Sequence, residues 1–388
     1  MASGASAPPI LHRWAARIDG DARGTQLSGT SGRASKGNEM TTQLQLGLDT
    51  FGDVTAGPDG ALKPHAQVIR DLVDQGVLAD ELGIDFFGIG EHHRADFAVS
   101  SPETVLAGIA TRTSRIRLGS AVTVLSSDDP IRVFQRFSTV DALSNGRAEV
   151  ILGRGSFTES FPLFGYELRD YETLFNEKLD LFAALLENGP VTWQGKLRPP
   201  LAGVTVYPEI EHGRLSAWIG VGGSPESVVR SVHYNIPMTL AIIGGDPKRF
   251  LPFVELYKRA QEQTGSGPMP LGVHSPGFVA DTDEEAREGL WPGYKAMHDR
   301  IGRERGWPET TKESFIHEIE HGSTYAGSPE TVARKIAATV RALGTDRFDL
   351  KYSSGTTSHD RMMKSIELYG TRVIPLVRDL LSQKEKAA

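Results

Sequence analysis

The chain has 388 residues, of which 39% are hydrophobic and 23% charged, and it carries a formal net charge of −7. This composition is typical of a soluble globular protein, and the acidic balance argues against a nucleic-acid partner, which would need a basic surface. No apolar run approaches the roughly 18 residues of a membrane span, and the lack of cysteine excludes disulfides, thiolate metal sites and a cysteine nucleophile. We therefore expect a cytoplasmic protein with no membrane partner.

Residues 1–39 differ from the rest of the chain. They are rich in Gly, Ser and Ala, show no periodic apolar face, and precede Met40, which we interpret as the natural start. The segment lacks the apolar core of a secretory signal, so we predict a disordered or vector-derived extension, with a transit peptide as the alternative. Residues 40–388 are expected to form a single domain.

From Leu44 onward, short β-rich runs alternate with longer amphipathic runs, which is the pattern of βα units in a parallel sheet. Two of the amphipathic runs, His65–Leu82 and Asp170–Leu186, repeat apolar residues at helical spacing. Eight strands are expected, at Leu44–Leu48, Phe86–Gly90, Arg117–Val124, Ala148–Leu152, Trp218–Val221, Pro237–Ile243, Leu271–Val279 and Phe348–Tyr352. Eight such units without a break in composition favour an α/β fold of the closed (β/α)8 TIM-barrel type over an open sheet.

Two connections are too long for ordinary loops. They run from Gly153 to Ala217, after the fourth strand, and from Asp281 to Arg347, after the seventh. Long connections in compact domains are usually lids or binding insertions, and in a barrel both would rise from the catalytic face.

The segment WIGVGGSPESVVRSV predicts an anion site. A strand ends at Val221, Gly222, Gly223 and Ser224 follow, and a helix is expected to begin near Pro225. Glycines let the backbone approach an oxyanion, and the N–H groups and dipole of the helix N-terminus favour negative charge. The alternative is that Ser224 only caps the helix. A dinucleotide fingerprint does not fit, because it would require glycine in place of the proline.

The segment VILGRGSF places Arg154 between two glycines at the end of the fourth strand. An arginine in that position can grip a phosphate with two hydrogen bonds, although a surface arginine in a loop is equally compatible with the pattern. Together with the Gly-Gly-Ser turn, this residue favours a ligand that carries a phosphate.

The segment FFGIGEHH places Glu91, His92 and His93 directly after the second strand. Barrel enzymes put catalytic groups at strand ends, and histidine transfers protons near neutral pH. An active-site role and a structural, hydrogen-bonded histidine are both compatible with the pattern. Adjacent residues of an extended chain point to opposite faces, so we expect a poor joint metal site, with His93 facing away from the ligand.

The segment HEIEH, from His317 to His321, satisfies the H-E-x-x-H pattern of zinc peptidases. Gly322 follows at once, which indicates a helix end, and neither a third histidine nor a downstream acidic helix offers another ligand. We interpret the segment as a charged helix end and predict no metal.

Four sequence blocks resemble the luciferase-like monooxygenases, more narrowly an uncharacterised branch of flavin-dependent oxidoreductases, and the resemblance runs from about Leu44 to Leu381. The most specific block is RIRLGSAVTVLSSDDPIRVFQRFSTVDALSNGRAEVILGRG. The supporting blocks are GIGEHH, WIGVGGSPESVVRSVHYNIP and YAGSPETVARKIAATVRALGTDRFDLKY.

The resemblance implies a role for each candidate residue. His92 would lie beside the flavin ring and assist proton transfer, and Arg154 would bind the flavin phosphate. The other expected cofactor-binding residues are Glu91, Gly222, Gly223, Ser224 and Ser227. Gly153 stands where bacterial luciferase has a cysteine, so luminescence is not implied.

The implied chemistry is oxygenation of a small organic substrate by reduced FMN and O2, a reaction of paired donors. A separate flavin reductase would supply the reduced FMN, and a homodimer is expected. The main alternative is hydride transfer with the deazaflavin coenzyme F420. Less favoured alternatives are a non-redox barrel enzyme that binds a phosphorylated substrate, a zinc peptidase, and a flavin-binding protein without catalysis.

Overall fold

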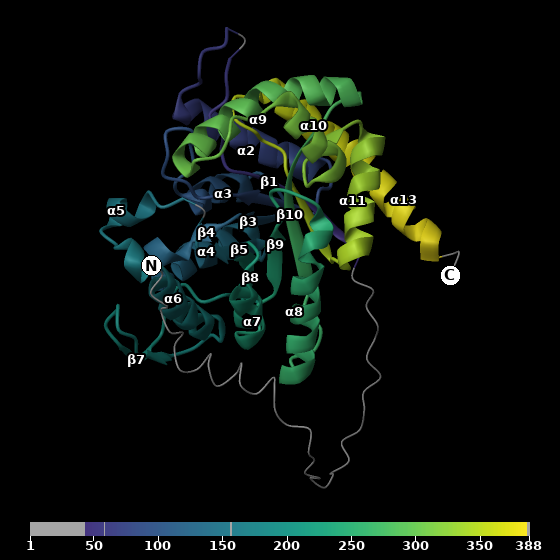
Figure 1. Ribbon diagram of the computed structural model, residues 1–388. Coiled ribbons are helices and arrows are strands. Elements are labelled where there is room, and N and C mark those ends of the chain that lie inside the picture. The colour runs from purple at the N-terminus through teal and green to yellow at the C-terminus, as the bar shows by residue number, and fades with distance from the viewer. Residues whose placement is uncertain (1–42, 58, 156, 386–388) are drawn as a thin grey trace. The chain divides into compact units, whose positions relative to one another are not determined.

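The strands of the βα units are all parallel and form a sheet that closes on itself as a barrel (Figure 1). The computed structural model describes residues 43–57, 59–155 and 157–385, so the predicted extension at 1–39 lies outside the described residues. In the order in which they neighbour one another, the barrel strands are β1 (Gln45–Thr50), β2 (Phe86–Ile89), β3 (Arg117–Ser120), β5 (Ala148–Gly153), β8 (Ser216–Val221), β9 (Met238–Ala241), β10 (Leu271–Val279) and β12 (Arg347–Lys351). Pairing of β12 with β1 closes the ring. The (β/α)8 prediction is confirmed.

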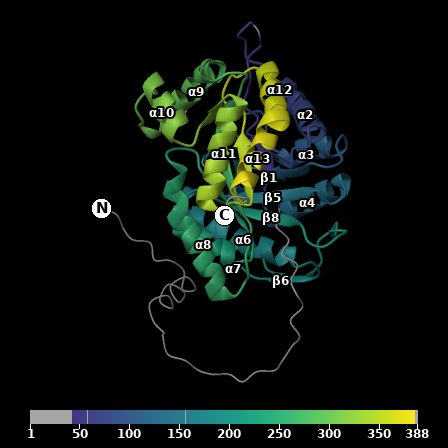
Figure 2. The ribbon, with the colours of Figure 1, turned by 90° about the vertical axis from the view of Figure 1, so that its right-hand side faces the viewer.

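Helices surround the barrel in Figure 1, and Figure 2 shows α11 and α13 from the side. The covering helices are α2 (His65–Glu81), α3 (Pro102–Ala110), α4 (Pro130–Ser144), α6 (Tyr171–Leu186), α7 (Pro225–His233), α8 (Leu251–Thr264), α11 (Pro329–Leu343), α12 (His359–Leu368) and α13 (Ile374–Glu385). Within the described residues, none of the helices has both the length and the apolar character that crossing a bilayer requires.

Helix α11 shows how the sequence sets these boundaries. The Ser328 side chain accepts a hydrogen bond from the Thr331 N–H and caps the helix, and Gly344 ends it with a left-handed φ of 65°. Between the caps, Val332, Ile336 and Val340 recur every four residues and are buried. Burial of each such side chain stabilises the fold by about 1.5–3 kcal/mol.

Both long insertions are present and contain structure of their own. The first holds α5 (Ser160–Phe164) and an antiparallel hairpin of β6 (Val191–Trp193) and β7 (Leu201–Val204). The second holds α9 (Asp283–Arg305), α10 (Lys312–His321) and β11 (Tyr325–Gly327). Sequence analysis did not predict the hairpin or β11, because strands of three or four residues carry little periodicity. The two-residue strand β4 (Thr123–Val124) falls inside the strand expected at Arg117–Val124.

The interior of the barrel is filled rather than open. Arg347 Nη1 lies 2.6 Å from Glu149 Oε2, and Arg347 Nε lies 2.8 Å from Asp349 Oδ2, with all three residues buried. The guanidinium carbon of Arg347 lies 3.5 Å from the centre of the Phe86 ring. Paired charges and an aromatic ring therefore form a packed floor, above which a ligand cavity can open.

Candidate functional site

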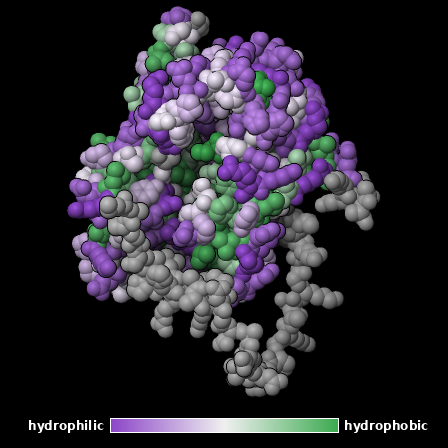
Figure 3. All heavy atoms as spheres, viewed as in Figure 1, coloured by the Kyte–Doolittle hydropathy of each residue, from purple (hydrophilic) through white to green (hydrophobic). Residues whose placement is uncertain are grey.

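A cavity of about 370 Å³ opens at the carboxyl ends of the barrel strands, a size typical of small-molecule sites. All eight barrel strands contribute to it: β10 and β12 through His274 and Asp349 from within the strand, and the others through their last residues or the residues that follow. Figure 3 shows a hollow near the middle of the visible face, with hydrophobic residues gathered beside it. The cavity has two chemically distinct ends. The histidine end is lined by Asp49, Phe51, His92 and His274. At the other end Arg154 and Gly222 line the cavity, and Glu172, Arg230 and the rest of the turn Gly222–Ser224 lie beside them; we call this group the arginine end.

His92 lies in the cavity wall among aromatic rings. Its ring centroid is 4.3 Å from that of Phe97, 4.7 Å from that of Phe51 and 5.4 Å from that of Phe157. Burial lowers the pKa of His92 to about 3, and the positive charge of Lys351 adds to the effect although Asp53 opposes it. The imidazole is therefore neutral at physiological pH, so that one ring nitrogen can accept a hydrogen bond while the other donates one.

His93 also lines the cavity, and the expectation that it faces away is wrong. Strand β2 ends at Ile89, so the chain at His92 and His93 no longer follows the alternation of an extended strand. His93 Nε2 lies 2.9 Å from Glu91 Oε1, and Glu91 Oε2 accepts a hydrogen bond of 2.8 Å from the Val124 N–H. Glu91 thus lines the cavity while its carboxylate holds His93 and the chain after β3 in place.

A second histidine, which sequence analysis did not single out, lies on the other side of Phe51. His274 Nδ1 is 2.6 Å from Asp49 Oδ2, and the ring is nearly parallel to that of Phe51 at 5.9 Å. Burial lowers the pKa of His274, but the negative charge of Asp49 and its hydrogen bond outweigh burial and raise the pKa overall. The pKa values of the two cavity histidines are therefore shifted in opposite directions, down for His92 and up for His274.

Three polar atoms on residues of the cavity lining have no hydrogen-bond partner among the described residues. They are Asp49 Oδ1, Ser160 Oγ and Thr239 Oγ1, and all three residues are almost fully buried. Because buried polar atoms are nearly always satisfied, these three favour a polar ligand or ordered water in the cavity. Asp49 and Thr239 lie on the barrel strands β1 and β9, and Ser160 lies on α5 of the first insertion.

The Gly-Gly-Ser turn has the expected geometry. Strand β8 ends at Val221 and α7 begins at Pro225, with Gly223 at a φ of 109° that a residue with a side chain adopts only under strain. Ser224 caps α7 by accepting a hydrogen bond of 3.2 Å from the Ser227 N–H, and the two hydroxyl oxygens lie 2.9 Å apart. Capping and anion binding are compatible here, since hydroxyl and backbone donors gather at the same helix N-terminus.

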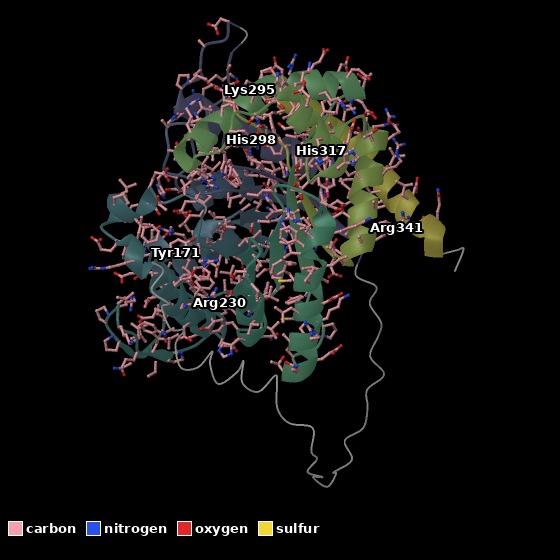
Figure 4. All side chains as sticks on the ribbon, viewed as in Figure 1. Tyr171, Arg230, Lys295, His298, His317 and Arg341 are labelled. Carbon is pink, nitrogen blue, oxygen red and sulfur yellow. The ribbon has the colours of Figure 1, made fainter. Side chains whose placement is uncertain are left out.

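Two arginines meet at this turn. Arg154 Nη1 forms an ion pair with Glu172 Oε1, and Arg230 Nη2 lies 3.7 Å from Glu172 Oε2. Arg230 Nη1 donates a hydrogen bond of 3.4 Å to Ser227 Oγ. Figure 4 shows Arg230 on α7 and Tyr171 at the start of α6. The centre of the Tyr171 ring lies 5.5 Å from the guanidinium carbon of Arg154. Burial lowers the pKa of Arg230, yet arginine stays charged at neutral pH.

The sequence patterns predict Arg154, Gly222, Gly223, Ser224 and Ser227 at this end, but they do not indicate Glu172 or Arg230. A signal for Arg230 was nevertheless present, because it lies three positions after Ser227 on one helix and therefore on the same face. Glu172 carried no such signal, since its position against the arginines depends on the packing of α6.

The HEIEH segment lies on α10, where Figure 4 shows His317 well separated from Tyr171 and Arg230. The carboxylate of Glu318 accepts hydrogen bonds of 2.9 Å from the Gly245 N–H and 2.7 Å from the Ser323 N–H, so it serves backbone groups. Within the part of the chain that the structure describes, no three His, Asp or Glu side chains gather as metal ligands. The absence of a functional metal stays a prediction.

Comparisons with known proteins identify the family of the chain. Residues 50–347 match the model of the luciferase-like monooxygenase family. The chain is 36% identical over 338 residues to 4-hydroxyprotoasukamycin monooxygenase of Streptomyces nodosus subsp. asukaensis, a match that covers 80% of this chain and 87% of that protein.

Two solved structures share the fold. The oxygenating constituent of 3,6-diketocamphane monooxygenase of Pseudomonas putida, in complex with FMN, is 18% identical, with a TM-score of 0.67 and coverage of 86% of this chain and 98% of that chain. An F420-dependent secondary alcohol dehydrogenase is 16% identical, with a TM-score of 0.66 and coverage of 87% of this chain and 100% of that one. The chain belongs to the luciferase-like monooxygenase family, whose members are flavin-dependent monooxygenases or oxidoreductases.

Proposed function

We propose that this protein binds reduced FMN in the cavity and uses it, together with O2, to oxygenate a small organic substrate. The observation that carries the proposal is the polarity of the cavity: two arginines and a helix N-terminus lie at one end, and a neutral histidine in an aromatic wall lies at the other. This arrangement is suited to a ligand with a terminal phosphate and a large flat ring. The 3,6-diketocamphane monooxygenase structure contains FMN.

The residues present fit a flavin at both ends. Arg154, Arg230 and the donors of the α7 turn would hold the phosphate, in the manner of charge-assisted hydrogen bonds. Asp49 Oδ1 and Thr239 Oγ1, which lack partners among the described residues, offer polar contacts near the ring. When bound, reduced FMN supplies the electrons that activate O2.

At the ring, the protein's own residues assist proton transfer and exclude water. His92 is neutral, so one ring nitrogen can accept a hydrogen bond while the other donates one, and through such contacts the imidazole can relay a proton at the ring. The two insertions meet above it, because Arg94 forms ion pairs with Glu159 of the first and Glu304 of the second. Glu159 also lines the cavity, so these ion pairs help to close its mouth against water.

F420-dependent hydride transfer is the second candidate, favoured by the likeness to the F420-dependent secondary alcohol dehydrogenase. The same arginine end could hold the phosphate of either cofactor. A separate flavin reductase, a homodimer and a cytoplasmic location complete the proposal.

An anaerobic titration followed by oxygen tests the proposal. We expect reduced FMN to bind under nitrogen more tightly than reduced F420, and admission of O2 to oxidise the bound FMN. Tight binding of F420 that persists unchanged in O2 would replace the proposal with hydride transfer. No binding of either cofactor would refute both.

A further inference from the structure

A carboxylate occupies the centre of the arginine end. One oxygen of Glu172 pairs with Arg154 and the other lies 3.7 Å from Arg230, so a single anionic group bridges both guanidinium groups. Arg230 in turn contacts the Ser227 hydroxyl, which lies beside the Ser224 hydroxyl at the start of α7. Glu172 thus uses the donors that a phosphate would need.

A bound phosphate and Glu172 cannot both make these contacts without a cost. Each carries negative charge, so the two groups repel each other when both lie against the same guanidinium groups. Burial lowers the pKa of Arg230, and repulsion by the charge of Arg154 lowers it further. An anion between the two arginines is therefore favoured in both states: the Glu172 carboxylate when the site is empty, and the phosphate when the cofactor is bound.

Glu172 is able to leave this position without disturbing the fold. Its side chain is 56% exposed, whereas that of Arg230 is only 8% exposed, so the carboxylate can turn into solvent while the buried arginine stays. Leu174 and Phe175, which follow on α6, are buried and hold the backbone of the helix in place.

We propose that Glu172 is an internal substitute for the cofactor phosphate, which it must release when the phosphate binds. The inference rests on the proposed function, because it assumes that a phosphate-bearing flavin binds at the arginine end. Glu172 then neutralises the arginine pair in the empty site and lowers the affinity for the phosphate. Lower affinity allows the cofactor to leave after each turnover, as required if a separate reductase supplies it in reduced form.

Binding of two flavins tests this assignment. Reduced FMN and reduced riboflavin, which lacks the phosphate, are titrated under nitrogen into the wild type, Glu172→Gln and Glu187→Gln. Glu187 ends α6 in an exposed surface pair with Arg214, so its substitution makes the same change in net charge away from the site. Thermal unfolding checks that each variant is folded.

We expect Glu172→Gln to bind FMN at least about threefold more tightly than the wild type, with riboflavin affinity unchanged and Glu187→Gln equal to the wild type. The inference is overturned if the ratio of FMN affinity to riboflavin affinity is unchanged or lower in Glu172→Gln than in the wild type. A lower ratio would mean that Glu172 positions the arginines. If the wild type binds riboflavin as tightly as FMN, the phosphate site itself is refuted, and the proposed function fails together with the inference.

Discussion

The histidine end and the arginine end of the cavity are built in opposite ways. At the histidine end, aromatic rings and buried strand residues fix the side chains, and burial sets the protonation state of His92. At the arginine end, exposed and buried charges meet at a loop, and one of them, Glu172, is half in solvent. A rigid, dry environment suits control of proton transfer, whereas an adjustable charged one suits binding and release.

The contrast predicts that substitutions at the two ends change different quantities. Changes at the histidine end should alter the rate of the reaction, and changes at the arginine end should alter cofactor affinity.

Replacement of His92 by Asn should slow turnover at least about tenfold, since a general acid or base is worth about 10²–10⁴-fold in rate. Flavin affinity should change little, because His92 lies away from the phosphate contacts. The rate of oxidation of bound reduced FMN after admission of O2, in a single turnover, measures the effect without knowledge of the substrate.

His93→Gln is the neighbouring variant for comparison, although it is not an inert control, because His93 lines the cavity and is held by Glu91. We expect a smaller loss of rate than in His92→Asn. A dispensable His92 together with an essential His93 would assign the proton transfer to His93 instead.

Replacement of Arg154 by Ala should weaken the binding of reduced FMN by roughly 1.5–3 kcal/mol, the value of a hydrogen bond to a charged group. The rate of the FMN-saturated enzyme should stay close to that of the wild type. Anaerobic titration gives the affinity, and equal affinity in a folded variant would remove Arg154 from the phosphate site.

The two histidines should give stability opposite dependences on pH. The pKa of His92 is about 3 in the folded protein and about 6.5 in the unfolded chain, so the unfolded state binds the extra proton between these values and stability falls on acidification. The pKa of His274 is raised, so its contribution is complete below about 6.5 and is lost as the pH rises through the folded value.

Denaturant unfolding of the wild type, His92→Asn and His274→Asn between pH 5 and 8 checks these signs. Relative to His92→Asn, the wild type should lose stability as the pH is lowered from 6.5. Relative to His274→Asn, the wild type should lose stability as the pH is raised from 6.5. Each change is limited to about 1.4 kcal/mol per pH unit. Parallel curves for the two variants would show that their environments do not differ as described.

Outside the cavity, His317→Ala should leave cofactor affinity and turnover unchanged, because Glu318 is engaged by backbone N–H groups. Elemental analysis should find no stoichiometric zinc. One zinc per chain, lost together with activity in His317→Ala, would move the functional site to α10.

The barrel could be predicted because the sequence signals of each βα unit lie within that unit. Each βα unit carries its own periodicity and caps, as in α11, and the eight expected strands match the observed ones to within a few residues. His92, Arg154 and the Gly222–Ser224 turn could be predicted for the same reason, since each directly follows a recognisable strand.

The remaining part of the site depends on which distant segments become neighbours. Asp49 and His274 are 225 residues apart and meet only because β12 closes the barrel between β1 and β10. Glu172 reaches the arginines through the packing of α6, and the orientation of His93 depends on where β2 ends. No local sequence pattern predicts these contacts.

A crystal structure of the protein with FMN would show directly where the phosphate and the ring bind. We predict the phosphate within hydrogen-bond distance of Arg154, Arg230 and the first N–H groups of α7, with the ring in the aromatic wall beside His92. A phosphate bound elsewhere, or a ring out of contact with His92, would contradict the assignment of the two ends.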